Sequence, residues 1–183
     1  MDNYLESVKK QFLYYKQLGE KAMEQLQEED LFWQYNEESN SISTIVNHLS
    51  GNMLSRFTNF LTSDGEKPWR NRDNEFEPKT ISKEELIKLW NKGWDCLLNA
   101  INQLSDEDLN AIIYIRNDGH TVTEAINRQL AHYPYHIGQI VFIGKMRKNE
   151  EWKTLSIARN KSADYNSRKF SNEKEKRHFT DDL

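Results

Sequence analysis

Four stretches of the chain repeat apolar residues every three or four positions, and this spacing constrains the fold more than any other feature of the sequence. The stretches cover residues 3–29, 41–61, 82–104 and 121–148. Apolar residues at that spacing form one stripe on a helix, which the chain buries by packing helices together. We therefore predict an all-α fold, and specifically a four-helix bundle with one long and two shorter connections.

Helix starts are marked by capping signals. Ser82 is followed three residues later by Glu85, and Thr121 by Glu124. In such a capping box the hydroxyl and the carboxylate accept hydrogen bonds from free amides of the first helical turn. These pairs predict that the third and fourth helices begin there.

The segment AIIYIRNDGHTV lies between the third and fourth predicted helices. It consists of two short β-branched or apolar runs around an Asn-Asp-Gly turn signal. We predict a small hairpin-like insertion at this place.

The chain has 183 residues, enough for one domain with a substantial core. Hydrophobic residues make up 37% and charged residues 30%, and five Trp, eight Tyr and eight Phe supply large apolar side chains for that core. We expect one domain over residues 1–162. Residues 163–183 carry mixed charge with few apolar residues, and they predict a charged, mobile C-terminal tail.

Charge and cysteine content narrow the class of protein. The net charge of -4 gives no concentrated excess of Lys and Arg, so nucleic acid is not expected as a partner. No stretch reaches the roughly 18 apolar residues that a membrane helix needs, and no apolar run follows a basic start at the N-terminus. The single cysteine, Cys96, excludes an internal disulfide and fits a reducing compartment. These features predict a cytoplasmic protein.

His132 and His136 are four residues apart, which places both imidazoles on one side of the fourth predicted helix, about 6 Å apart. Between them lies Pro134, which costs roughly 3 kcal/mol inside an ordinary helix. A metal ion held by both histidines is one interpretation. Two buried, hydrogen-bonded histidines in a curved helix are the other.

A third ligand is needed for a metal site, and His48 on the second predicted helix is the candidate. On a helical wheel it lies on the flank of the apolar stripe, so periodicity alone favours a solvated position. Asn52 and Arg56, one and two turns further on, are groups that orient an anionic ligand if this flank is a site.

The connection over residues 63–80 is longer than two helices need, and it contains Trp69 and Phe76. One interpretation is a lid or pocket wall. The other is a structural plug in which the two aromatic side chains cap the bundle.

The segments IVNHLSGNM and HYPYHIGQI resemble the DinB-like (YfiT-like) superfamily of bacterial metalloenzymes, and a subfamily of unknown function within it. The resemblance covers about residues 3–166. It implies a four-helix bundle with one metal ion held by His48, His132 and His136. Relatives in that superfamily include thiol-dependent S-transferases and a mycothiol-dependent maleylpyruvate isomerase.

One segment departs from the subfamily that the chain resembles. A Pro-Arg-Gly turn follows Leu-Ser-Ile there, whereas here LSIARN has Ala158 and Asn160. The path of this segment, and with it the role of Arg159, does not follow from the resemblance.

Three neutral imidazoles leave a divalent ion with an open position for water or substrate. Zinc is the default, and nickel, iron or cobalt also accept nitrogen ligands. We expect a metal-dependent transferase that passes a low-molecular-weight thiol to a small-molecule electrophile. The alternative is a non-catalytic, dimeric metal- or ligand-binding protein, and a metal-dependent hydrolase ranks lower because no carboxylate base is evident beside the histidines. A homodimer is expected in either case.

Four residues are candidates for contacts with the substrate. They are Asn52, Arg56, Trp69 and Arg159.

Overall fold

Helices make up most of the structure, a computed structural model that describes residues 4–77 and 81–181. The α-helices are α1 (Tyr4–Glu24), α2 (Glu28–Leu31), α3 (Ile42–Phe57), α4 (Lys83–Asn102), α5 (Val122–Lys148) and α6 (Ser162–Phe170). Short 3-10 helices are η1 (Asp73–Glu75), η2 (Asp106–Asn110) and η3 (Asn149–Glu151). The predicted helical fold is confirmed. Residue 3 of the first predicted helix, residues 78–80 of the long connection and residues 182–183 of the tail lie outside the described ranges.

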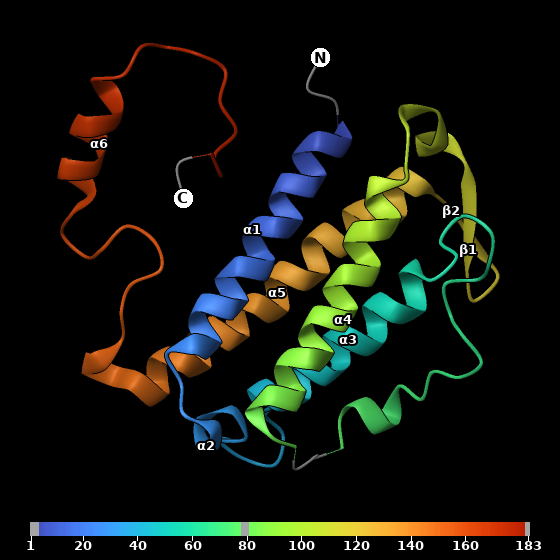
Figure 1. Ribbon diagram of the computed structural model, residues 1–183, viewed down its shortest axis with the longest axis horizontal. Helices are drawn as coiled ribbons and strands as arrows, with labels where there is room; N and C mark the ends of the chain where they lie inside the picture. Colours follow the sequence, from blue (N-terminus) through green and yellow to red (C-terminus); the bar gives the residue numbers. More distant parts are fainter. Residues whose placement is uncertain (1–3, 78–80, 182–183) are drawn as a thin grey trace.

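The four long helices pack against one another with their axes roughly aligned (Figure 1). α1 contacts α5 and α4, while α3 contacts α4 and α5. Large aromatic side chains fill the space between them: Phe12 of α1 meets Trp94 of α4 and Tyr133 of α5, with ring centroids 6.4 and 6.0 Å apart. Each such buried side chain stabilises the fold by about 1.5–3 kcal/mol. The finer assignment to a four-helix bundle remains a prediction.

Capping interactions fix the starts of three long helices. The hydroxyls of Ser82 and Thr121 accept hydrogen bonds from the backbone amides of Glu85 and Glu124. The carboxylates of these glutamates in turn accept hydrogen bonds from the backbone amides of the two cap residues. Both predicted capping boxes are therefore confirmed. Ser41 caps α3 in the same way.

The first predicted helix, 3–29, ends early in the structure. α1 stops at Glu24, and a separate turn, α2, follows. The carboxylate of Asp30 accepts the amide of Gln27 at 3.1 Å and forms an ion pair with Arg147 of α5 at 2.6 Å. These two contacts stabilise a new helix start where the periodicity predicts continuation.

The second predicted helix, 41–61, is also shorter, since α3 ends at Phe57. Asn59 adopts a φ of 51°, in the left-handed region that ends a helix. Its carbonyl then accepts the amides of Thr62 and Ser63, each at 3.0 Å. The chain leaves the helix here and begins the long connection to α4.

A two-stranded antiparallel hairpin joins α4 to α5, as predicted, and consists of β1 (Ile112–Ile115) and β2 (Asp118–Thr121). Its turn is formed by Arg116 and Asn117, with φ of 56° and 64°, and so lies one residue before the Asn-Asp pair of the predicted Asn-Asp-Gly signal. Asp64 explains the shift, because its carboxylate accepts both turn amides at 2.9 Å. These hydrogen bonds, with a third from the amide of Glu66, lower the pKa of Asp64 to about 2.

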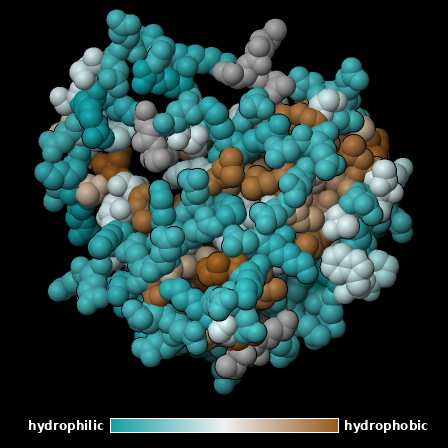
Figure 2. All heavy atoms as spheres, viewed as in Figure 1, coloured by the Kyte–Doolittle hydropathy of each residue, from teal (hydrophilic) through white to brown (hydrophobic). Residues whose placement is uncertain are grey.

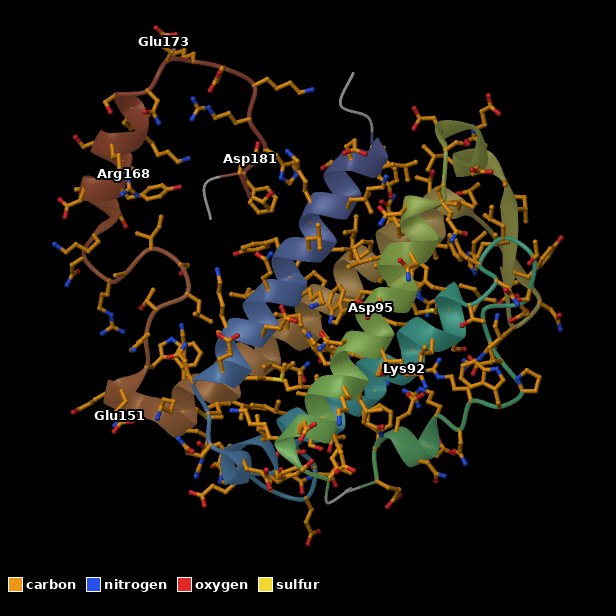
Figure 3. The ribbon with its side chains drawn as sticks, viewed as in Figure 1. Lys92, Asp95, Glu151, Arg168, Glu173 and Asp181 are labelled. Carbon is orange, nitrogen blue, oxygen red and sulfur yellow. The ribbon has the colours of Figure 1, made fainter. Side chains whose placement is uncertain are left out.

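The C-terminal region leaves the helical body and returns to it (Figure 1). Asn160 has a φ of 64°, a conformation that glycine or asparagine supplies at a turn. After α6, Asp181 lies beside α1 (Figure 3), where it forms a 2.7 Å ion pair with Lys10. Phe179 also contacts Tyr14 edge to face. Mobility of this tail remains a prediction.

The surface is mainly hydrophilic on the face shown in Figure 2, with apolar patches between the polar side chains. Within residues 4–77 and 81–181, no helix combines the length and apolar character needed to cross a membrane.

Candidate metal centre

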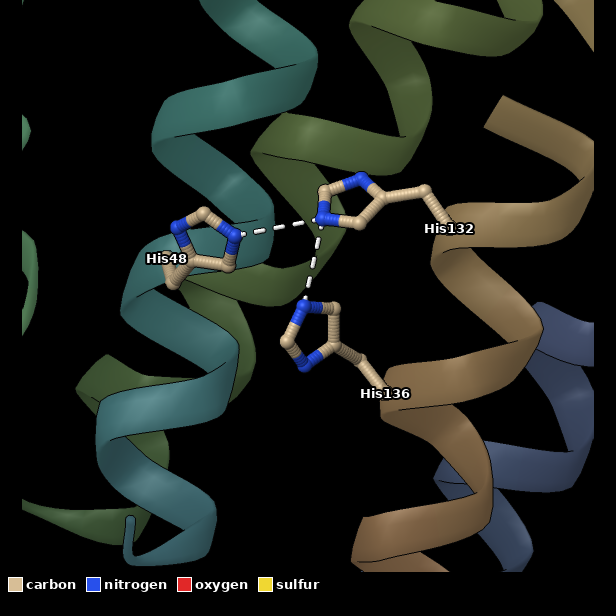
Figure 4. A group of neighbouring side chains, drawn as sticks. All are labelled: His48, His132 and His136. Atoms are coloured by element: carbon tan, nitrogen blue, oxygen red, sulfur yellow. Dashed lines mark hydrogen bonds between the residues drawn. The ribbon is translucent and has the colours of Figure 1, made fainter. Parts of the chain in front are cut away.

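Three histidines from two helices meet at one point in the structure (Figure 4). Nε2 of His132 lies 3.3 Å from Nε2 of His48 and 3.2 Å from Nε2 of His136. One nitrogen from each ring lies within 4.8 Å of the others. Nitrogen ligands about 2.0–2.1 Å from a tetrahedral zinc ion stand about 3.3 Å from one another. The His48–His132 and His132–His136 distances match this value, while all three nitrogens lie within 4.8 Å, so a modest movement of the rings would let one ion contact all three.

Neighbouring side chains orient two of these rings. Nδ1 of His48 lies 2.9 Å from Oε2 of Glu75, and Nδ1 of His132 lies 3.2 Å from Oε1 of Gln129. Both partners are acceptors, so each Nδ1 carries the proton and each Nε2 presents a lone pair to the centre. Two lone pairs that face each other at 3.3 Å repel unless a proton or a cation lies between them. The arrangement is that of ligands prepared for a cation.

The rings of His132 and His136 are neutral at physiological pH. Burial, followed by the neighbouring histidines, lowers the pKa of His132 to about 3. Burial and the proximity of His48 lower the pKa of His136 to about 4. A neutral imidazole is the form that binds a metal ion, so protons compete weakly for this site at pH 7.

His48 is buried, with 5% of its surface exposed, and the solvated position favoured by periodicity is wrong. The long connection after α3 covers it. Phe76 stacks on its ring with centroids 4.9 Å apart, while Glu75, itself 6% exposed, binds its Nδ1. Gly51, one turn along α3, makes room for this contact, because a methyl group there would overlap the Glu75 carboxylate.

Glu75 is held in place by a second partner. Nε and Nη2 of Arg70 donate to its two oxygens at 2.7 and 2.9 Å. Burial raises the pKa of Glu75, but the bonds from His48 and Arg70 outweigh that effect and lower it overall. A charged carboxylate that accepts the Nδ1–H bond raises the basicity of the opposite nitrogen, Nε2 of His48, and so makes it a stronger metal ligand.

The histidines lie at one side of a cavity of about 550 Å³ between α3, α5 and the long connection. Asn52 and Arg56 of α3, two of the four candidate substrate residues, both line it. Asn52 accepts a 3.0 Å hydrogen bond from Tyr133, and Arg56 is 8% exposed. Burial lowers the pKa of Arg56, partly offset by its hydrogen bond to Glu66.

The other two predicted substrate residues do not line this cavity. The Trp69 side chain is 59% exposed, and Arg159 is exposed in the segment between η3 and α6. The long connection does contribute a wall through Arg70, Arg72 and Phe76. Trp69, in contrast, does not cap the core.

Sequence reasoning missed Glu75, Arg70 and the role of Gln129. Gln129 precedes His132 by three residues on one helical face, a spacing that brings side chains together and is a usable signal. Glu75 is 27 residues from His48, and its position depends on how an irregular segment folds back. No local pattern predicts that contact.

Fold and site together define a mostly helical protein with a candidate three-histidine metal centre. The chain belongs to a family described as "Protein of unknown function (DUF1572)", whose profile matches residues 1–161. No curated protein and no solved structure matches the chain significantly.

Proposed function

We propose that the protein is a DinB-like four-helix-bundle metalloenzyme in which His48, His132 and His136 bind one divalent ion. Zinc is the default, with nickel, iron or cobalt as alternatives. The observation that supports this most strongly is the orientation of His48 and His132, whose Nδ1 atoms face acceptors so that both Nε2 lone pairs point to a common centre. A purely structural histidine cluster needs a proton between each pair of facing nitrogens.

The proposed reaction is transfer of a low-molecular-weight thiol to a small electrophile. A divalent ion, when bound, lowers the pKa of a coordinated thiol or water. The thiol loses its proton to solvent water, its sulfur forms the new bond to the electrophilic carbon, and a leaving group such as chloride departs from that carbon with the bonding electron pair. The three histidines hold the site, Glu75 and Gln129 fix the ring orientations, and Asn52 and Arg56 position the substrate from the cavity wall.

A hydrolase ranks lower because the nearest carboxylate already has partners. Glu75 bonds to His48 and, through both oxygens, to Arg70. A general base needs a free lone pair within hydrogen-bond reach of the attacking water. Glu75 instead serves as an anchor for a metal ligand.

The alternative function is a non-catalytic binding protein that forms a homodimer. Exposed apolar side chains on α5 and the segment before α3 favour a partner surface: Tyr135 is 67% exposed, Phe142 62% and Tyr35 74%. The three side chains line one surface depression, and contiguous exposed apolar surface often marks an interface. We propose a homodimer for either function, located in the cytoplasm, where a lone thiol such as Cys96 stays reduced.

The test is a thiol-transfer assay on protein purified without a metal-affinity tag. A panel of low-molecular-weight thiols would be offered to 1-chloro-2,4-dinitrobenzene with zinc-loaded protein, chelator-treated protein and the His132→Ala variant. We expect thiol consumption that requires the metal and is lost in the variant. Stoichiometric metal without turnover across the panel would instead support the binding protein.

A further inference from the structure

The cavity beside the histidines is lined by five arginines, a large number for a chain with a net charge of -4. They come from α3, the long connection, the hairpin turn and α5. The five are Arg56, Arg70, Arg72, Arg116 and Arg128.

Three of the five share two carboxylates. Glu66 forms ion pairs with Arg56 at 3.2 Å, Arg116 at 3.1 Å and Arg70 at 3.7 Å. Arg70 also binds Glu75. These contacts fix the wall of the cavity, but two carboxylates do not balance five guanidinium groups. Arg72 and Arg128 remain outside these ion pairs.

Arg72 and Arg128 have no carboxylate partner in the described part of the chain. Arg72 lies over the ring of Phe76, 5.1 Å from its centroid, and Phe76 stacks on His48. Arg128 lies one turn before His132 on α5, close enough that its charge adds to the effect of burial in lowering the pKa of His132. Both residues are exposed and line the cavity that the histidines line.

We propose that this cavity binds a small organic anion, whose carboxylate or phosphate group is held by Arg72 and Arg128 while its other end faces the three histidines. Carboxylate and phosphate groups both present two oxygens that can accept two parallel hydrogen bonds from one guanidinium. The inference rests on the proposed function only for the end of the anion that faces the three histidines, where the reaction would take place. Anion binding itself needs the arginines and not the metal.

The pairing pattern supports a binding role over a structural one. Arg56 and Arg70 are the buried arginines, and both have carboxylate or carbonyl partners that account for their burial. Arg72 and Arg128 stabilise no such partner, and each adds repulsion to an already positive cavity. A bound anion relieves that repulsion.

The experiment is isothermal titration of zinc-free protein with inorganic phosphate and, separately, with succinate. Wild type is compared with an Arg72→Gln/Arg128→Gln variant, which leaves the Glu66 and Glu75 ion pairs intact and so keeps the fold. Arg168→Gln is the matched control, because Arg168 is an exposed arginine of α6 outside this cavity. His132→Ala reports whether anion binding survives without the histidine centre.

We expect saturable binding of at least one probe, weakened about tenfold or more in the double variant and unchanged in the control. Binding should persist in His132→Ala, so that loss of metal binding and loss of anion binding are separate results. Preference for phosphate or for succinate identifies the anionic group. Absence of saturable binding of both probes, or equal binding by wild type and the double variant, would overturn the inference.

Discussion

Two hydrogen bonds decide what the histidines of this protein present to one another. Glu75 and Gln129 accept the Nδ1 protons of His48 and His132, so the opposite nitrogens meet as lone pairs. The same rings with reversed tautomers would donate protons to the centre and exclude a cation. The acceptors therefore matter as much as the ligands.

Replacing Glu75 by glutamine tests the role of the Glu75 carboxylate as acceptor, since only one side-chain atom is exchanged. The neutral amide is a weaker acceptor for Nδ1–H of His48 and no longer neutralises Arg70. We expect zinc affinity to fall roughly 10- to 100-fold, the usual cost of losing a group that supports a metal ligand. Competition titration with a chromophoric zinc chelator would measure it.

Glu66→Gln is the matched control, since Glu66 contacts arginines of the cavity and forms no hydrogen bond to a histidine within the described residues. Its zinc affinity should change far less than that of Glu75→Gln. Equal affinities for Glu75→Gln and wild type would show that the carboxylate does not support the site.

The regular elements could be predicted from the sequence, because their signals are local. Apolar spacing located the long helices, and the pairs Ser82/Glu85 and Thr121/Glu124 located two of their starts correctly. The predicted hairpin is present, but its turn moved because Asp64, far away in the sequence, binds the turn amides.

The candidate site could be predicted only in part. His132 and His136 share a helical face by spacing alone, and the resemblance supplied His48. Periodicity placed His48 in solvent, since a helical wheel reports which side faces other helices and not what an irregular segment covers. Glu75 and Phe76 come from such a segment, and they bury His48.

Two glycines allow a matched test of helix packing. A Cβ at Gly93 of α4 would lie 2.8 Å from the Cα of Ser50 in α3, so the backbones must separate. We expect Gly93→Ala to lower the free energy of unfolding by about 1–3 kcal/mol through overpacking. Chemical denaturation would measure the loss.

Gly138→Ala in α5 is the control, because nothing lies within 4 Å of the added methyl group. It should raise the free energy of unfolding by up to about 1 kcal/mol, the difference in helix propensity between the two residues. Stabilisation by both substitutions would contradict the close approach of α3 and α4.

The whole molecule should lose stability in acid when it is free of metal. The pKa values of His132 and His136 fall from 6.5 to about 3 and about 4 on folding. Between pH 6.5 and about 4 the unfolded chain binds protons at these positions and the folded chain does not, so acid favours unfolding. The free energy of unfolding should therefore decrease as the pH falls through this range.

Thermal unfolding of chelator-treated protein as a function of pH would measure this decrease. His132→Asn removes one titrating ring and should flatten the profile, whereas His120→Asn, in the hairpin, should not alter the contribution of His132 and His136. An identical pH profile for wild type and His132→Asn would show that the cluster does not titrate as described.

The central claim is that three histidines hold one metal ion. Metal content per chain, measured by mass spectrometry on protein purified without a metal-affinity tag and then equilibrated with zinc, tests it most directly. We expect one zinc per chain in wild type and in His120→Ala, and less than about a tenth of that in His48→Ala, His132→Ala and His136→Ala, since two remaining nitrogens bind zinc weakly. Wild-type protein without stoichiometric metal, or full metal content in the three cluster variants, would contradict the claim.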